Sequence, residues 1–158
     1  MDVATLTRTL EPLFAALRGR SPDADLEAEL QRRFAPDGAL FGAIEAACHA
    51  AIADGWMCAQ GEGNRRFGRV IEAGEATGGF SVDVVDLTDL AGPHHRHPNG
   101  EICMVMPQTP GALFDGRPAG WCVYAAGTAH RATVSGGRAL VLYLLPDGAI
   151  EFTDLAAG

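Results

Sequence analysis

The chain has 158 residues, of which 47% are hydrophobic and 20% charged, so it can bury the core of one globular domain without disulfide or zinc stabilisation. Its 20 acidic and 12 basic side chains give a formal charge of −8, which disfavours nucleic acid and anionic membranes as partners. All 12 basic residues are arginine, which excludes reactions that need a lysine amine, such as Schiff-base catalysis.

The amino terminus and the cysteines favour a cytoplasmic location. No charged segment followed by an apolar run opens the chain, and no apolar stretch approaches the about 20 residues of a membrane span. The four cysteines show no C-x-x-C spacing. In a reducing compartment we expect them to be buried, unpaired thiols.

The first third of the chain is predicted to be helical. Apolar residues recur at helical spacing over residues 2–18, about 21–35 and 37–54. Ser21, followed by Pro22, is the expected N-cap of the second helix. Residues 1–55 therefore form an N-terminal helical segment of about three helices.

From Trp56 onward, glycine-rich turns separate short β-rich runs, as in a β-sandwich or barrel. The candidate strands are residues 56–59, 65–72, 80–88, 100–106, 112–115, 121–125, 138–145 and 149–153. We expect residues 56–158 to form this β-barrel. The helical segment should pack on the barrel as part of the same domain.

Two of these strands bear on packing and assembly. In 100–106, residues 102, 104 and 106 face one way while Glu101 and Cys103 face the other. The run 139–145 is apolar on both faces, so a helix or a partner subunit should cover its outer face. We expect a homodimer.

Histidines and one carboxylate gather late in the chain. His95 and His97 are two residues apart, so an extended strand puts both imidazoles on one face. Glu101 has the same parity if the chain stays extended, and His130 follows a later strand. These four residues suit a single divalent transition metal, among them Fe, Mn, Co, Ni, Cu and Zn. His94 has the opposite parity and should point away from the metal.

The spacing H-x-H-x-x-x-E at residues 95–101, followed by G-x-x-H at 127–130, resembles the two cupin motifs. The resemblance implies a mainly β fold, a cupin-type β-barrel (jelly roll) preceded by the helical segment. It also supports His95, His97, Glu101 and His130 as the metal ligands.

A closer resemblance covers most of the chain. The segments that carry it are 80–86, 91–95, 97–101 and 137–146, which look like the 4-hydroxylaminobenzoate lyase family. It implies that 4-hydroxylaminobenzoate and water are converted to 3,4-dihydroxybenzoate and ammonia, in nitroarene degradation. A cupin-type Fe(II) dioxygenase acting on an aromatic compound and a non-catalytic ligand-binding cupin are the alternatives.

A small aromatic carboxylate as substrate requires a cation, and arginine binds carboxylates in a bidentate manner. Arg69 and Arg131 are the candidates for this contact, and Tyr143 is a further candidate to line the cavity. Glu101, as ligand or as proton shuttle, and His94 are the candidate catalytic residues.

Overall fold

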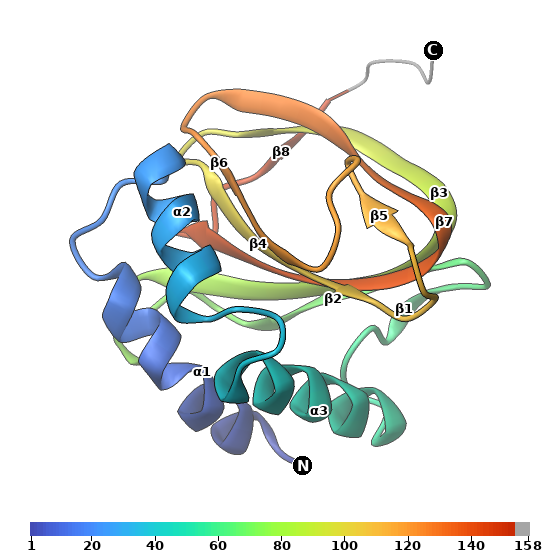
Figure 1. Ribbon diagram of the computed structural model, residues 1–158, viewed down its shortest axis with the longest axis horizontal. Coiled ribbons are helices and arrows are strands. Elements are labelled where there is room, and N and C mark those ends of the chain that lie inside the picture. Colours follow the sequence, from blue (N-terminus) through green and yellow to red (C-terminus); the bar gives the residue numbers. More distant parts are fainter. Residues whose placement is uncertain (154–158) are drawn as a thin grey trace.

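The computed structural model describes residues 1–153. Its helices are α1 (Val3–Leu17), α2 (Ala24–Arg33) and α3 (Ala39–Ala53). They lie together on the outside of a curved sheet (Figure 1). A short 3-10 helix, η1 (Glu75–Thr77), follows β2. Among residues 1–153, no helix is both long enough and apolar enough to cross a membrane.

Aspartates begin the first two helices. The carboxylate of Asp2 accepts a hydrogen bond from the amide of Thr5 at 2.8 Å, and that of Asp23 accepts one from the amide of Leu26 at 2.9 Å. The prediction that Ser21 is the N-cap of the second helix is wrong. A carboxylate also interacts favourably with the positive end of the helix dipole, which a hydroxyl does not.

The β-strands are β1 (Gln60–Glu62), β2 (Arg65–Ile71), β3 (Phe80–His97), β4 (Glu101–Pro107), β5 (Leu113–Phe114), β6 (Gly120–Tyr124), β7 (Thr128–Pro146) and β8 (Glu151–Phe152). Their order is β1-β2-β3-β7-β4-β6, with β5 paired to β7 and β8 paired to β3, all antiparallel. The strands curl around a common interior (Figure 1). This architecture confirms the predicted mainly β, cupin-type fold with its helical lead-in.

Two strand predictions need correction. No strand forms at 56–59, because Cys58 adopts a φ of +53°, which an extended strand does not permit. The predicted strands 80–88 and 138–145 are only parts of β3 and β7. Irregularities in pairing between Thr88 and Leu90, and between Ala91 and His94, let β3 bend and continue.

Strand β7 separates two apolar cores. Leu140, Leu142 and Leu144 belong to the core shared with the helices, whereas Ala139 and Val141 belong to the core inside the barrel. Strand β4 divides its side chains in the same way. The helices of the same chain thus cover the outer face of β7, which is one of the two covers that the sequence analysis expected. The homodimer stays a prediction.

Helix α2 covers the free edge of β6. The side chain of Gln31 accepts a hydrogen bond from the backbone amide of Trp121 and donates one to its carbonyl, both at 3.0 Å. Glu27 accepts a hydrogen bond from the amide of Val123 at 2.9 Å. These bonds satisfy backbone groups that an exposed edge strand would leave unpaired.

Candidate metal centre

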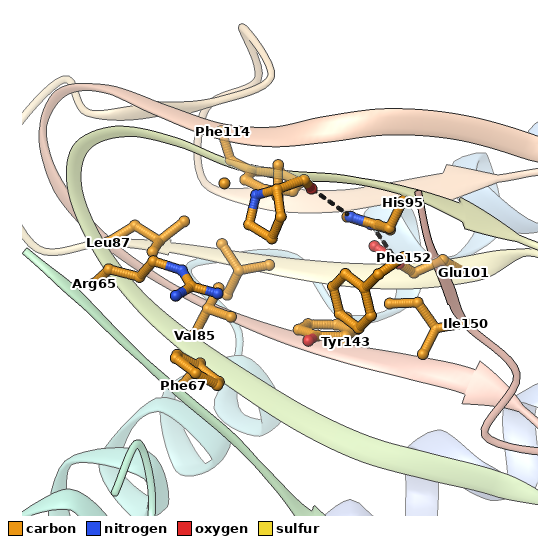
Figure 2. Close-up of a pocket in the computed structure, with 14 residues that line it drawn as sticks. Arg65, Phe67, Val85, Leu87, His95, Glu101, Phe114, Tyr143, Ile150 and Phe152 are labelled. Carbon is orange, nitrogen blue, oxygen red and sulfur yellow. Dashed lines mark hydrogen bonds and ion pairs between the residues drawn. The ribbon is translucent and has the colours of Figure 1, made fainter. Parts of the chain in front are cut away.

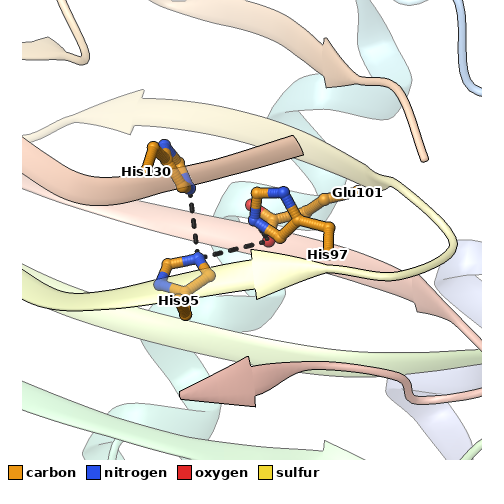
Figure 3. Close-up of side chains that lie close together, drawn as sticks. All are labelled: His95, His97, Glu101 and His130. Atoms are coloured by element: carbon orange, nitrogen blue, oxygen red, sulfur yellow. Dashed lines mark hydrogen bonds and ion pairs between the residues drawn. The ribbon is translucent and has the colours of Figure 1, made fainter. Parts of the chain in front are cut away.

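Three strands bring together four potential ligands. His95 and His97 lie at the end of β3, Glu101 begins β4, and His130 lies near the start of β7 directly opposite His95. Figure 3 shows these side chains pointing toward one another, and one ligand atom from each lies within 4.8 Å of the others. We call His95, His97, Glu101 and His130 the ligand cluster.

The chain reaches Glu101 by a different path from the predicted one. It does not stay extended after His97 but turns at residues 98–100, where Gly100 adopts a φ of +89°. A Cβ at Gly100 would lie 2.5 Å from Cγ of Pro22 and 2.7 Å from the carbonyl oxygen of Tyr124. The turn between His97 and Glu101 therefore requires glycine both for its conformation and for its space.

The substitution Gly100→Ala should destabilise the protein more than Gly111→Ala. Gly111 also has a positive φ, +84°, but a Cβ there would meet nothing within 4 Å. We expect Gly111→Ala to cost about 1–2 kcal/mol from its left-handed backbone alone. Steric overlap should add about 1–3 kcal/mol for Gly100→Ala. Urea denaturation measures both values, and equal losses would show that the turn relaxes freely.

Each imidazole of the ligand cluster is held by its Nδ1 atom. Nδ1 of His95 lies 3.1 Å from the carbonyl oxygen of Pro93, and Nδ1 of His97 lies 3.0 Å from Oγ1 of Thr128. Nδ1 of His130 lies 2.6 Å from Oδ2 of Asp115. When Nδ1 donates to these oxygens, the lone pair of each Nε2 faces the centre, the arrangement typical of metal-bound histidine.

The centre has the electrostatics of a cation site. Nε2 of His95 and Nε2 of His130 are 3.1 Å apart, and Nε2 of His97 lies 2.7 Å from Oε2 of Glu101. Despite this closeness, Nε2 of His97 and Oε2 of Glu101 form no hydrogen bond with each other or with another group within residues 1–153, and both atoms are buried. Such atoms are costly to bury unless a cation binds them. The donor set of nitrogen and oxygen fits a divalent transition metal.

Glu101 provides the negative charge of the centre. Burial by itself raises the pKa of a carboxyl group, but the neighbouring imidazoles of His95 and His97 outweigh this effect and lower the pKa of Glu101 to about 2. Sγ of Cys103 donates to Oε1 of Glu101 at 2.7 Å. Burial, together with the charge of Glu101, raises the pKa of Cys103, so this thiol stays protonated.

Asp115 is the supporting residue that the sequence did not reveal. Besides His130, it accepts hydrogen bonds from the hydroxyl of Tyr124 and, at 3.0 Å, from the amide of Thr133. Burial favours a raised pKa, but the bonds with His130 and Tyr124 hold the pKa of Asp115 below its usual value. The Asp115-Gly116 pair signals a turn in the sequence. Nothing in the spacing places that turn beside His130.

His94 lies outside the ligand cluster. Its Nδ1 atom is 2.6 Å from Oγ1 of Thr153, on the segment that follows β8. His94 is not one of the four described residues whose ligand atoms converge. A catalytic part for His94 stays a prediction.

A cavity adjoins the ligand cluster. It is partly open to solvent and reaches the cluster through His95 and Glu101. Most of its wall is apolar or aromatic, and the side chains drawn in Figure 2 include Phe67, Phe114 and Phe152. A wall of this kind suits a flat aromatic ligand.

The residues predicted to bind substrate lie in three different settings. Tyr143 lines this cavity and a second one that shares several of its residues. Arg69 lines only the second cavity, where its guanidinium contacts Asp83 at 3.1 Å and the carbonyl oxygen of Gly148 at 3.1 Å. Arg131 pairs with His94 across the sheet, on the face opposite to that of His130.

Comparisons with known proteins identify the family of this chain. A family model described as "PnbB: 4-hydroxylaminobenzoate lyase" matches residues 8–152. The chain is 30% identical over 151 residues to a 4-hydroxylaminobenzoate lyase of Nocardioides sp. (strain LMS-CY), covering 89% of each chain. It is 28% identical over 162 residues to one of Pseudomonas putida, covering 91% of this chain and 92% of that protein.

Among solved structures, the chain is similar to an RmlC-like cupin protein from Ralstonia eutropha JMP134. The two are 11% identical, with a TM-score of 0.44 over 59% of this chain and 62% of that one. The family match covers nearly the whole described chain and includes every member of the ligand cluster. The chain therefore belongs to the 4-hydroxylaminobenzoate lyase family of enzymes.

Proposed function

We propose that this protein is a metal-dependent lyase that converts 4-hydroxylaminobenzoate and water to 3,4-dihydroxybenzoate and ammonia, a step in nitroarene degradation. The observation that carries the proposal is the ligand cluster at the wall of an aromatic cavity, in a member of this family. The reaction needs no external oxidant. Cleavage of the N–O bond supplies the oxidising equivalent for the second ring hydroxyl, and nitrogen leaves as ammonia.

The ligand cluster would hold one divalent ion. Fe, Mn, Ni, Co and Zn all accept three imidazoles and a carboxylate. Such an ion supplies a Lewis acid and an open coordination position for an oxygen ligand. The lowered pKa of Glu101 keeps its carboxylate ionised at the cavity wall, so Glu101 can bind the ion or exchange a proton with a bound group.

The remaining residues position the substrate. Phe67, Phe114 and Tyr143 offer apolar surface to the ring and exclude water from it. Burial raises the pKa of Tyr143, with the nearby carboxylate of Asp83 adding to the effect, so the phenol stays neutral in the cavity wall. It can then donate a hydrogen bond to a bound ligand without adding charge.

Anaerobic turnover tests the function directly. Metal-loaded protein incubated with 4-hydroxylaminobenzoate without oxygen should release ammonia and 3,4-dihydroxybenzoate in a 1:1 ratio, and chelator-treated protein should release neither. A strict requirement for oxygen would instead indicate a dioxygenase. Binding of aromatic acids without turnover or oxygen uptake would indicate a non-catalytic cupin.

Two further properties stay predictions. The acidic surface and unpaired cysteines suggest a cytoplasmic protein, and a homodimer remains to be tested by light scattering. A clean monomer at micromolar concentration would contradict the dimer.

A further inference from the structure

We propose that Arg65 binds the carboxylate of the substrate and thereby selects rings whose carboxylate lies opposite the reacting nitrogen. This inference rests on the proposed function and names the residue that recognises its substrate. The ligand cluster keeps its proposed role, because Arg65 is a different residue of the cavity wall.

The cavity has two chemically different sides. Figure 2 shows His95 and Glu101 on one side and the guanidinium of Arg65 on the other, with Val85 and Leu87 beside it. Arg65 is the one arginine among the described residues that line this cavity. A matching ligand would have an anion at the end near Arg65, a polar group at the end near the ligand cluster, and an apolar part between them.

Arg65 is available for a ligand. Its guanidinium stacks on the ring of Phe67, 4.3 Å from the ring centroid. Within the part of the chain that the structure describes, it forms no ion pair with a carboxylate. By contrast, Arg138 forms a bidentate pair with Asp86 at 2.8 and 2.9 Å. Stacking orients the planar group and leaves its N–H donors free for a carboxylate.

Partial burial makes the contact effective. Arg65 is half-buried at the cavity wall, whereas its neighbour Arg66 is exposed and on the opposite face of β2. A charge-assisted, bidentate hydrogen bond is stronger where water screens it less. The guanidinium of Arg69 is already held by Asp83, so Arg65 is the better candidate for this contact.

The ring geometry gives specificity. In 4-hydroxylaminobenzoate the carboxylate and the nitrogen stand at opposite ends of a rigid ring. An anchor at Arg65 would then direct the nitrogen toward His95 and Glu101. The 3-substituted isomer held by the same anchor would direct its nitrogen to the apolar wall, and its turnover should be poor.

Binding of unreactive ligands tests the inference separately from catalysis. We would titrate metal-loaded protein with 4-hydroxybenzoate and with phenol, which lacks the carboxylate, by calorimetry. The substitution Arg65→Met should weaken 4-hydroxybenzoate about 10–100-fold and leave phenol unchanged, which also shows that the cavity stays folded. Arg65→Lys should recover part of the affinity, and the matched control Arg66→Met should bind both ligands as the wild type does.

The outcomes separate the two proposals. Equal 4-hydroxybenzoate affinity for Arg65→Met and the wild type, or a wild type that does not prefer 4-hydroxybenzoate over phenol, would overturn the role of Arg65. If Arg65→Met shows the expected loss but the wild type releases no ammonia from 4-hydroxylaminobenzoate, the lyase function fails and the carboxylate site stands.

Discussion

The substitution His97→Ala should abolish both metal binding and ammonia release. His97 is fully buried, its Nε2 atom points to Glu101, and its Nδ1 atom is held by Thr128. Removing it takes away one of the three imidazoles of the ligand cluster. Since loss of a mere supporting residue costs about 10–100-fold in metal affinity, loss of a ligand should exceed about 100-fold.

Metal analysis of the purified variant, beside an ammonia assay, measures this effect. The control is His49→Ala, because His49 is exposed on α3 and far in sequence from the cluster. That variant should retain its metal and its activity. Full metal content in His97→Ala would show that the site has been assigned to the wrong residues.

Asp115→Asn should weaken metal binding about 10–100-fold while the protein stays folded. Oδ2 of Asp115 accepts from His130 and Tyr124, and Oδ1 accepts from the amide of Thr133. An asparagine has one acceptor oxygen, so its amide group must face one of these donors. Either orientation removes a hydrogen bond, and the loss of negative charge makes His130 a weaker ligand.

Competition titration with a coloured chelator measures the affinity of the Asp115→Asn variant. Asp89→Asn is a matched control, because Asp89 and Asp115 both have a positive φ and both accept a hydrogen bond from a backbone amide. For Asp89 the donor is the amide of Gly137, at 3.0 Å. Asp89 belongs to no part of the ligand cluster. If both variants bind metal equally well, Asp115 does not support His130.

The sequence predicts those parts of the site that depend on local spacing. His95 and His97 share a face because strand side chains alternate, and the motif spacing adds Glu101 and His130. It predicts the helices because their apolar residues recur with the helical period. None of these predictions requires knowing which strand pairs with which.

Features that depend on strand pairing escape the sequence. Arg65 and Arg69 have the same parity on β2, and nothing local separates them. Their partners on β3 do so, because Arg65 lies opposite Leu87 while Arg69 lies opposite Asp83. One arginine therefore meets an apolar wall and keeps its donors, and the other meets a carboxylate that occupies them.

The three imidazoles differ in how they tolerate sequence change. His97 and His130 depend on the side chains of Thr128 and Asp115, so a single substitution can remove either support. His95 depends on the main-chain carbonyl of residue 93, which every amino acid possesses. Relatives can thus adjust the basicity of two histidines by ordinary mutation, whereas the orientation of the third changes only if the backbone of β3 takes another path.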